Sequence, residues 1–378
     1  MVVVADILLI GIALTVFALF HHVLPRRETS VGLVSSREAA GGSQALIGTT
    51  DDEYDSGGDG GDVGLNLSEL SGEDLSFSED GLDGSADAQA ADAMPAETAV
   101  PEATPTAEPA ADASEAVGDL TADVPGFFGN KFADKFTDGE VVKSKSGYRS
   151  KNVNITLKRY DGWNTEFYVA DIYVRDITCL VSAFAQGTFG KGIRDRARKI
   201  SMDIGAVIAI NGDFYGARSD GIVIRNGELY RSDKYPDRDV CVLFWDGTME
   251  TYGTGKFDAK AAIDAGAYQA WNFGPRLLDS DGKARTHFNS DVWKSNPRTA
   301  LGYFEPGHYC FVVVDGRQEG SSGLELRELA VLMRDLGCAR AYNMDGGNTS
   351  VMVAGDRIVN HPSGGGRATS DIIAIVDK

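Results

Sequence analysis

The stretch Tyr342-Asn343-Met344-Asp345-Gly346-Gly347-Asn348-Thr349-Ser350 places six hydrogen-bonding side chains around two adjacent glycines. Its first three residues, with Ala341 before them, form a short strand-like run, 341–344. Apolar runs bounded by turn residues are typical of buried strands. We therefore expect a buried strand that ends in a tight, polar turn. By itself such a turn is equally well explained by local Asx hydrogen bonding.

Two other stretches repeat this pattern elsewhere in the chain. The run 208–216 ends a buried strand in Asn211-Gly212-Asp213-Phe214-Tyr215, and the run 312–317 ends another in Asp315-Gly316-Arg317. A rigid sheet can direct several such loops into one cleft. Three polar turns in one region therefore favour a shared functional site over three independent turns.

Arginines next to proline or glycine form the second half of the expected site. Arg276 and Arg298 each follow a proline, Arg317 follows Asp315-Gly316, and Arg367 follows three glycines. A guanidinium binds an oxyanion through two parallel hydrogen bonds, and exposed backbone amides can add to the same site. The pattern indicates a binding site for phosphate.

The residues from 124 onward alternate between strand-like runs and turns. Two segments, 192–203 and 324–336, have helical spacing. Asn226-Gly227, Asp246-Gly247 and Asp281-Gly282 are expected to be ordinary hairpin turns. Many strands in irregular order with few helices predict an α+β domain, a mixed β-sheet with flanking helices. The expected strands are 153–160, 167–174, 180–185, 207–211, 240–245, 299–304, 308–314, 341–344 and 371–376.

Charge is distributed unevenly along the 378 residues. The segment 51–124 holds 21 Asp or Glu and no Lys or Arg, which leaves 35 acidic against 36 basic residues elsewhere. The formal charge of −20 therefore belongs to one segment, and no basic groove for nucleic acid is implied. Residues 26–123 are poor in large apolar side chains and predict an acidic, disordered linker. Residues 124–378 are expected to form one catalytic domain.

The first 25 residues predict a transmembrane signal anchor, since all but Asp6 of the first 24 are uncharged and mostly apolar. A cleaved signal peptide is the competing interpretation, but small residues do not follow the apolar run. Arg26 and Arg27 would orient the domain to the cytoplasm under the positive-inside rule. The substrate class that the domain indicates favours a single-pass protein with an extracytoplasmic domain, and we give that more weight.

Four cysteines, at 179, 241, 310 and 338, show neither a C-x-x-C pair nor the spacing of metal ligands. We expect buried free thiols, with one disulfide as the alternative if the domain is extracytoplasmic. The histidines at 287, 308 and 361 are scattered, which argues against zinc, although paired aspartates could hold calcium or magnesium. No cofactor is expected.

The polar turns, the two Pro-Arg blocks and the segment 323–330 (GLELRELA) together resemble the phosphodiester glycosidase family. The likeness runs from about Asn152 to Lys378. The family usually reads D-G-G-G-S-S where this chain has Asp345-Gly346-Gly347-Asn348-Thr349-Ser350, so Asn348 adds a side chain next to the expected site.

The resemblance implies hydrolysis of a sugar 1-phosphodiester in a glycan or cell-envelope polymer. An oxocarbenium-like sugar needs a carboxylate nearby, and arginines can neutralise the leaving phosphate. Asp345 and Asp213 are the preferred catalytic candidates, with Asp315 and Glu325 as further ones. The expected substrate-binding residues are Asn211, Arg276, Arg298, Arg317, Asn343, Gly346, Gly347, Asn348, Thr349, Ser350 and Arg367.

The main alternative of another class is a non-catalytic module that binds or assembles exopolysaccharide or wall polymer. The retained carboxylates favour the enzyme. The chain has no G-x-x-x-x-G-K-[ST], H-E-x-x-H or G-x-S-x-G motif.

Overall fold

The computed structural model describes residues 73–74, 126–144, 146–233, 238–253 and 257–378. The predicted membrane anchor and nearly all of the predicted acidic linker lie outside these residues. No helix of the described part has both the length and the apolar character needed to cross a membrane.

The largest sheet contains the longest strands, β4 and β5, and has the order β15-β13-β14-β5-β4-β3-β2, with β1 also pairing β4. Its strands are β1 (Glu73–Asp74), β2 (Val142–Lys143), β3 (Gly147–Arg149), β4 (Val153–Gly162), β5 (Thr165–Val174), β13 (Arg298–Glu305), β14 (His308–Val314) and β15 (Arg340–Asn343).

Two five-stranded sheets complete the fold, in the orders β11-β10-β12-β8-β9 and β17-β16-β7-β18-β6. The second sheet comprises β8 (Gly221–Arg225), β9 (Glu228–Asp233), β10 (Val240–Phe244), β11 (Met249–Tyr252) and β12 (Ala267–Trp271). The third comprises β6 (Leu180–Phe184), β7 (Ile208–Asn211), β16 (Met352–Ala354), β17 (Arg357–Ile358) and β18 (Asp371–Ile375).

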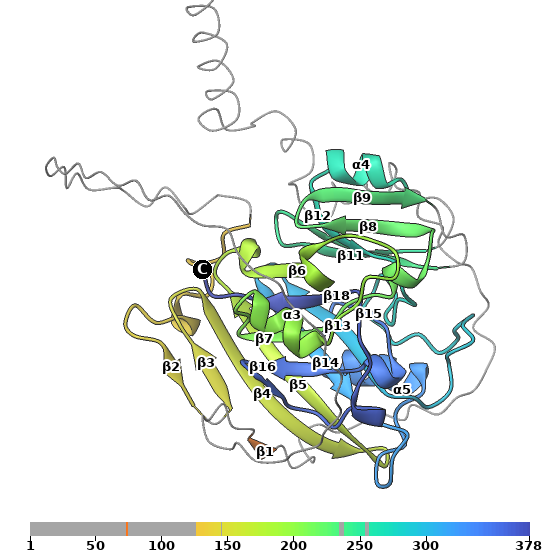
Figure 1. Ribbon diagram of the computed structural model, residues 1–378. Helices are drawn as coiled ribbons and strands as arrows, with labels where there is room; N and C mark the ends of the chain where they lie inside the picture. Colours follow the sequence, from red (N-terminus) through yellow and green to blue (C-terminus); the bar gives the residue numbers. More distant parts are fainter. Residues whose placement is uncertain (1–72, 75–125, 145, 234–237, 254–256) are drawn as a thin grey trace, which may run out of the picture.

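Helices are short and lie at the outside of the sheets (Figure 1). Asp258 caps α4 by accepting hydrogen bonds from Lys260 N and Ala261 N, and Glu325 starts α5 in a capping box with Glu328. The described α-helices are α3 (Ala197–Asp203), α4 (Ala259–Asp264) and α5 (Leu326–Asp335). Short 3₁₀ turns occur at η2 (Ala133–Lys135), η3 (Ile177–Cys179), η4 (Ala185–Gly187), η5 (Tyr215–Ala217), η6 (Gly347–Thr349) and η7 (Ser363–Gly365).

The core lies on both faces of the largest sheet. In β5, Tyr168 and Ala170 face a cluster shared with the other two sheets, whereas Phe167 and Val169 face a cluster that includes the apolar side of α5. Successive side chains of a strand point to opposite faces, so a strand buried on both sides is apolar along its buried length, as β14 is after His308. The largest sheet therefore supplies a rigid support for the loops at its strand ends.

The predicted fold class needs correction in two respects. The described residues form a mostly β fold with few short helices, and every strand pairing among them is antiparallel, so the sheets are not mixed. Local periodicity identifies a strand but carries no information about the direction of its neighbour. All nine predicted strands and both predicted helices are present, with ends displaced by a few residues. The sequence does not predict β1, β2, β3, β8, β9, β11, β12, β16 and β17.

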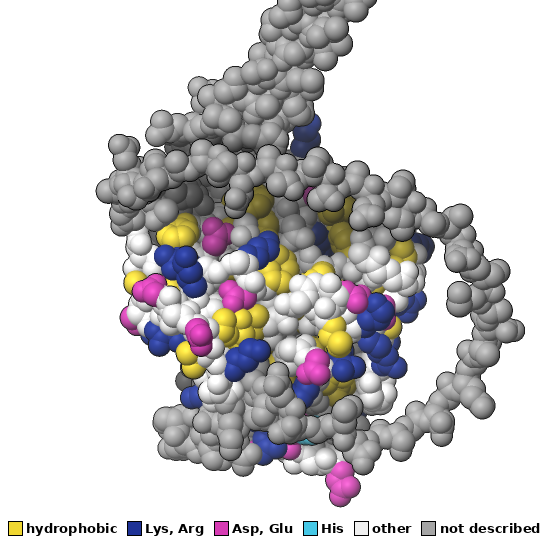
Figure 2. All heavy atoms as spheres, turned by 60° about the vertical axis from the view of Figure 1, so that its left-hand side comes forward, with side chains coloured by type: hydrophobic (Ala, Val, Ile, Leu, Met, Phe, Trp, Pro, Cys, Tyr) yellow, Lys and Arg dark blue, Asp and Glu magenta, His cyan; other side chains and the backbone are white. Residues whose placement is uncertain are grey.

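Smaller predictions agree with the structure. Asn226-Gly227 is the turn between β8 and β9, with both residues at positive φ (53° and 84°), and Asp246-Gly247 lies between β10 and β11. All four cysteines are buried and unpaired. Figure 2 shows Lys and Arg side chains interspersed with Asp and Glu on one face, as expected if the excess negative charge lies in the linker.

Candidate active site

An open cleft of about 1740 Å³ lies where β15 ends. Its walls contain Asp345 and the turn that follows it, together with segments from positions 214, 238–239, 273–298, 317 and 367. Eight arginines line it: Arg218, Arg238, Arg276, Arg285, Arg298, Arg317, Arg340 and Arg367. The opposing acidic residues are fewer, so the cleft favours an anionic ligand.

Asp345 is the predicted catalytic candidate that the structure places in this cleft. It is 6% exposed, and its Oδ2 accepts a hydrogen bond from an Arg367 Nη of 3.0 Å. Burial raises the pKa of the Asp345 carboxyl, and the charge of Arg367 and the hydroxyl of Thr349 offset only part of that rise. A carboxylate in this setting can accept a proton, or it can stabilise positive charge that develops beside it.

Asn211 holds the backbone of the Asp345 turn. Asn211, at the end of β7, donates from Nδ2 to the Asp345 carbonyl (2.7 Å) and accepts at Oδ1 from Thr299 Oγ1 (2.8 Å). Asn211 is fully buried and absent from the lining of the cleft, so its hydrogen bonds position the turn, and its direct contact with substrate stays a prediction.

Asn343, unlike Asn211, lines the cleft. Its Nδ2 donates to the Gly274 carbonyl (2.8 Å), while its buried Oδ1 has no hydrogen-bond partner among the described residues. A buried acceptor without a partner is costly. Asn343 therefore offers an oxygen that a ligand hydroxyl could satisfy.

The Arg317 side chain is held beside the Asp345 turn by hydrogen bonds. Its guanidinium donates to Asn296 Oδ1 (2.7 Å) and to Asn348 Oδ1 (3.1 Å), and the residue has a positive φ of 60°. Gly347 has a φ of +65°, and a Cβ there would lie 3.2 Å from this guanidinium. Gly347 thus lets the arginine approach the backbone, whereas a Cβ at Gly346 would lie 2.8 Å from the Pro297 carbonyl oxygen; Asn348 is bound to Arg317.

Arg367 connects Asp345 to the rest of the turn. Its Nε donates to Thr349 Oγ1 (2.9 Å), and its guanidinium lies 5.0 Å from the centre of the Phe214 ring. Thr349 and Ser350 are both 1% exposed and are absent from the lining of the cleft, so they support the turn and do not face a ligand.

The arginines of the two Pro-Arg motifs differ in their burial and their contacts. Arg276 lines the cleft, and its backbone N–H donates to Asp239 Oδ2 (2.9 Å). Arg298 is 2% exposed and donates to the carbonyls of Leu324 (2.8 Å), Val292 (2.7 Å) and Lys294. Burial and the neighbouring Arg317 lower the pKa of Arg298 to about 10. Its Nε and one Nη thus bind backbone carbonyls, although the residue also lines the cleft, and the phosphate contact of Arg298 stays a prediction.

Asp213 lies beneath the cleft in a buried charged group. It accepts from Tyr215 N (3.0 Å) and Asn272 N (3.1 Å), and it pairs with Arg225 at 3.1 Å. Arg225 also binds Asp371 Oδ2 at 2.8 Å. Asp213 is close enough for its charge to contribute to the raised pKa of Asp345, but it is not part of the cleft wall. A catalytic role for Asp213 stays a prediction.

The other two carboxylate candidates lie elsewhere. Asp315 accepts from Asn360 Nδ2 (2.8 Å) and His361 N (3.0 Å), and burial raises its pKa. Glu325 is the cap of α5 and pairs with Arg327 at 2.8 Å. The structure does not bring either residue to the wall of the cleft, and their catalytic roles stay predictions.

The sequence interpretation missed several residues of the cleft. Phe214 directly follows a predicted carboxylate but carries no polar group that would single it out; Arg218 lies 5.9 Å from its ring. Arg340 pairs with Glu250 at 2.8 Å, although 90 residues separate them, so no local pattern identifies them. Arg225, beneath the cleft, was missed because an arginine in a strand is normally solvent-exposed.

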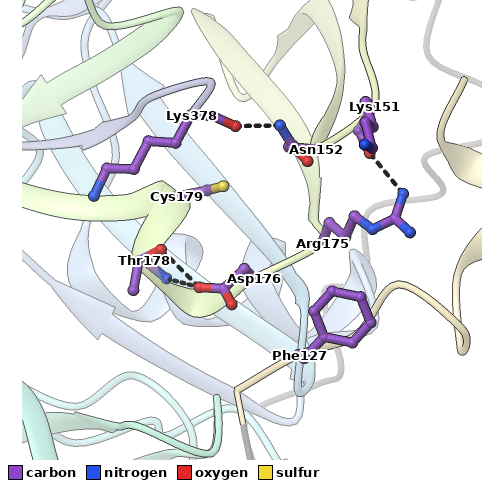
Figure 3. A pocket seen from close by; sticks show the side chains of 8 residues that line it. All are labelled: Phe127, Lys151, Asn152, Arg175, Asp176, Thr178, Cys179 and Lys378. Atoms are coloured by element: carbon purple, nitrogen blue, oxygen red, sulfur yellow. Dashed lines mark hydrogen bonds between the residues drawn. The ribbon is translucent and has the colours of Figure 1, made fainter. Parts of the chain in front are cut away.

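A second pocket of about 420 Å³ lies apart from the cleft and contains none of the predicted site residues (Figure 3). In Figure 3, the Asn152 amide reaches the Lys378 carbonyl, and Thr178 donates to Asp176. The residues that line it are Phe127, Lys151, Asn152, Arg175, Asp176, Thr178, Cys179 and Lys378.

The cleft is carried on antiparallel sheets, is lined by arginines and has the buried Asp345 carboxyl in its wall. This arrangement is that of a protein class that binds an anionic ligand beside an acid or base. The family model described as phosphodiester glycosidase matches residues 204–376. Residues 204–376 therefore carry a phosphodiester glycosidase family domain, which confirms the resemblance seen in the sequence.

Two relatives extend this finding. The chain is 32% identical over 196 residues to the SPbeta prophage-derived protein YomE of Bacillus subtilis; the match covers 50% of this chain and 30% of that protein, so less than a third of the relative is represented. The catalytic domain of zebrafish N-acetylglucosamine-1-phosphodiester alpha-N-acetylglucosaminidase has the same fold, with a TM-score of 0.51 and 19% identity over 65% of this chain and 86% of that one.

Proposed function

We propose that this protein is a hydrolase that cleaves sugar 1-phosphodiesters, in a glycan or a cell-envelope polymer, in the arginine-lined cleft. The observation that carries the proposal is the Asp345–Arg367 pair, a buried carboxyl next to a guanidinium in the wall of an open cleft. The match of residues 204–376 to the phosphodiester glycosidase family model supports the same substrate class.

In the proposed reaction the bond between the anomeric carbon and the bridging oxygen breaks. Water adds its oxygen to the anomeric carbon, and the bridging oxygen leaves with the phosphate as a phosphomonoester. Arg367, Arg317 and Arg276 stabilise the charge on the leaving phosphate. The Asp345 carboxylate stabilises the oxocarbenium-like sugar or takes the proton from water.

Asn343 and Asn348 are the proposed contacts for the sugar. The unpaired Oδ1 of Asn343 can accept from a sugar hydroxyl, and Asn348, where the family has glycine, narrows the space beside Arg317. Thus Asn348 is the residue expected to change which sugar is accepted.

We further propose that the domain acts outside the cytoplasm on a single-pass anchor. The apolar first 25 residues and the acidic segment 51–124 support a membrane attachment followed by a spacer. A protease-accessibility assay on intact cells would detect the domain outside, whereas protection until the cells are lysed would contradict this placement.

Hydrolysis in oxygen-18 water tests the reaction. Purified protein is incubated with a panel of glycosyl-1-phosphodiesters, and both products are analysed by mass spectrometry. Label on the sugar is expected. Label on phosphorus would mean an ordinary phosphodiesterase, and binding without turnover across the panel would favour the non-catalytic polymer-binding module.

A further inference from the structure

A second group of chemically active side chains lies outside the cleft, on the largest sheet. It consists of Glu166 in β5, Asp315 directly after β14, and His361 after β17. β5 and β14 are neighbours, and the Asp315 backbone N–H donates to the Glu166 carbonyl at 2.9 Å, so the sheet holds the two carboxylates together. None of the three lines the cleft.

The three side chains converge on one point. His361 Nδ1 lies 3.3 Å from Asp315 Oδ2 and 3.5 Å from Glu166 Oε2, and the three ligand atoms lie within 4.8 Å of one another. Zinc binds nitrogen and oxygen ligands at about 2.0–2.2 Å, so the corners of a regular tetrahedron around it are about 3.3–3.6 Å apart. The two measured separations match the edges of such a tetrahedron.

Charge also favours a cation at this point. The Asp315 side chain is 1% exposed, and among the described residues no Lys or Arg forms an ion pair with it. Glu166 adds a second negative charge, and Arg159 reaches it only at 4.0 Å. Two adjacent carboxylates, one of them buried, are unfavourable unless a positive charge joins them.

Neighbouring residues contact all three ligands. The Tyr168 hydroxyl donates to Glu166 Oε2 (3.0 Å) and lies 3.0 Å from His361 Nδ1, so zinc would replace these two contacts. Asn360 donates to Asp315 Oδ1 (2.8 Å), and Asp315 Oδ2 accepts from the His361 backbone N–H (3.0 Å) and lies 3.3 Å from the imidazole Nδ1. Hydrogen bonds such as that from Asn360 to the other carboxylate oxygen are usual around metal ligands. The His361 side chain is 66% exposed, so solvent can reach a fourth coordination position.

We propose that Glu166, Asp315 and His361 form a zinc site. The ion would join β5, the end of β14 and the segment after β17. Asp315 lies two residues before Arg317 of the cleft wall, so the bound ion would stabilise the arginine turn from behind. The chain order hides the site, because the ligands come from three distant segments with no zinc-binding spacing.

Metal titration of the full-length protein tests the proposal without any substrate. Protein stripped with a chelator is titrated by calorimetry with Zn²⁺ and, separately, with Ca²⁺ and Mn²⁺. One Zn²⁺ per chain is expected, bound more tightly than Ca²⁺. Glu166→Gln and His361→Gln are each expected to weaken zinc binding at least tenfold. In the parent, Co²⁺ should give the intense visible absorption of a four-coordinate ion.

His308→Gln is the matched control. His308 Nε2 lies 2.6 Å from Asp171 Oδ1, an equivalent histidine–carboxylate pair, but no third ligand joins it in the described part of the chain. This variant should bind zinc like the parent. Glu166 is partly exposed, so Glu166→Gln should melt at the parental temperature in chelator, which excludes misfolding. Equal zinc affinity in the parent and both ligand variants, no saturable site, or tighter Ca²⁺ binding would each overturn the proposal.

Discussion

Replacing Asp345 with asparagine removes the one carboxyl that the structure places against Arg367 in the cleft wall. The side chain keeps its shape and loses its charge. Two unit charges about 4 Å apart interact by about 4 kcal/mol at an effective dielectric constant of 20. If the carboxylate stabilises a positively charged sugar at that distance, kcat/KM should fall about a thousandfold.

The assay compares single-turnover rates of the parent and Asp345→Asn on the best phosphodiester of the panel. Asp356→Asn is the control, since Asp356 lies in the exposed turn between β16 and β17, outside the cleft wall. It should keep parental activity. Asp345→Asn should still melt cooperatively, because the Arg367 side chain that it faces is 44% exposed and can find water. Parental turnover by Asp345→Asn would refute its catalytic role and leave it as a turn residue whose Asx hydrogen bond asparagine preserves.

Three further predictions separate structural from chemical roles. Arg317→Ala should lower kcat/KM with little change in melting, with partial rescue by Arg317→Lys. Arg298→Ala should lose roughly 3 kcal/mol of unfolding free energy, because one buried and two partly buried carbonyls lose their donor. Equal melting of the two variants would contradict this division. Burial raises the pKa of Asp371 to about 7, so the folded state keeps a proton that the unfolded chain, with a pKa of about 3.9, releases. That contribution to stability is present below about pH 4 and is lost as the pH rises to 7. Asp371→Asn should therefore flatten the dependence of the melting temperature on pH over this range. An unchanged dependence on pH in the variant would contradict the raised pKa of Asp371. Residues 124–378 expressed alone should melt cooperatively at the same temperature as residues 26–378, and loss of cooperative melting would show that the linker is needed for folding.

Local chemistry explains what could be predicted about the fold and the site. The strands around 167–174 and 308–314 are visible because apolar alternation or continuity is a property of neighbouring residues. The turn at Asp345 is visible because two glycines and a carboxylate after a buried strand need no distant partner to be recognised. In the same way the Pro-Arg motifs indicated arginines at turns, although they did not indicate which way each guanidinium points.

The sequence by itself determined the approximate position of nine of the described strands, which turn carries Asp345, and that arginines suited to phosphate are present. Only the tertiary structure decided that the described pairings are all antiparallel, that Arg298 binds carbonyls while Arg367 reaches Asp345, and that Asp213 is paired with Arg225. It also brought His361 to Glu166 and Asp315. The reason is that a side chain's role depends on the partner it meets, and these partners come from other strands far along the chain, joined by sheet register and burial that no local pattern encodes.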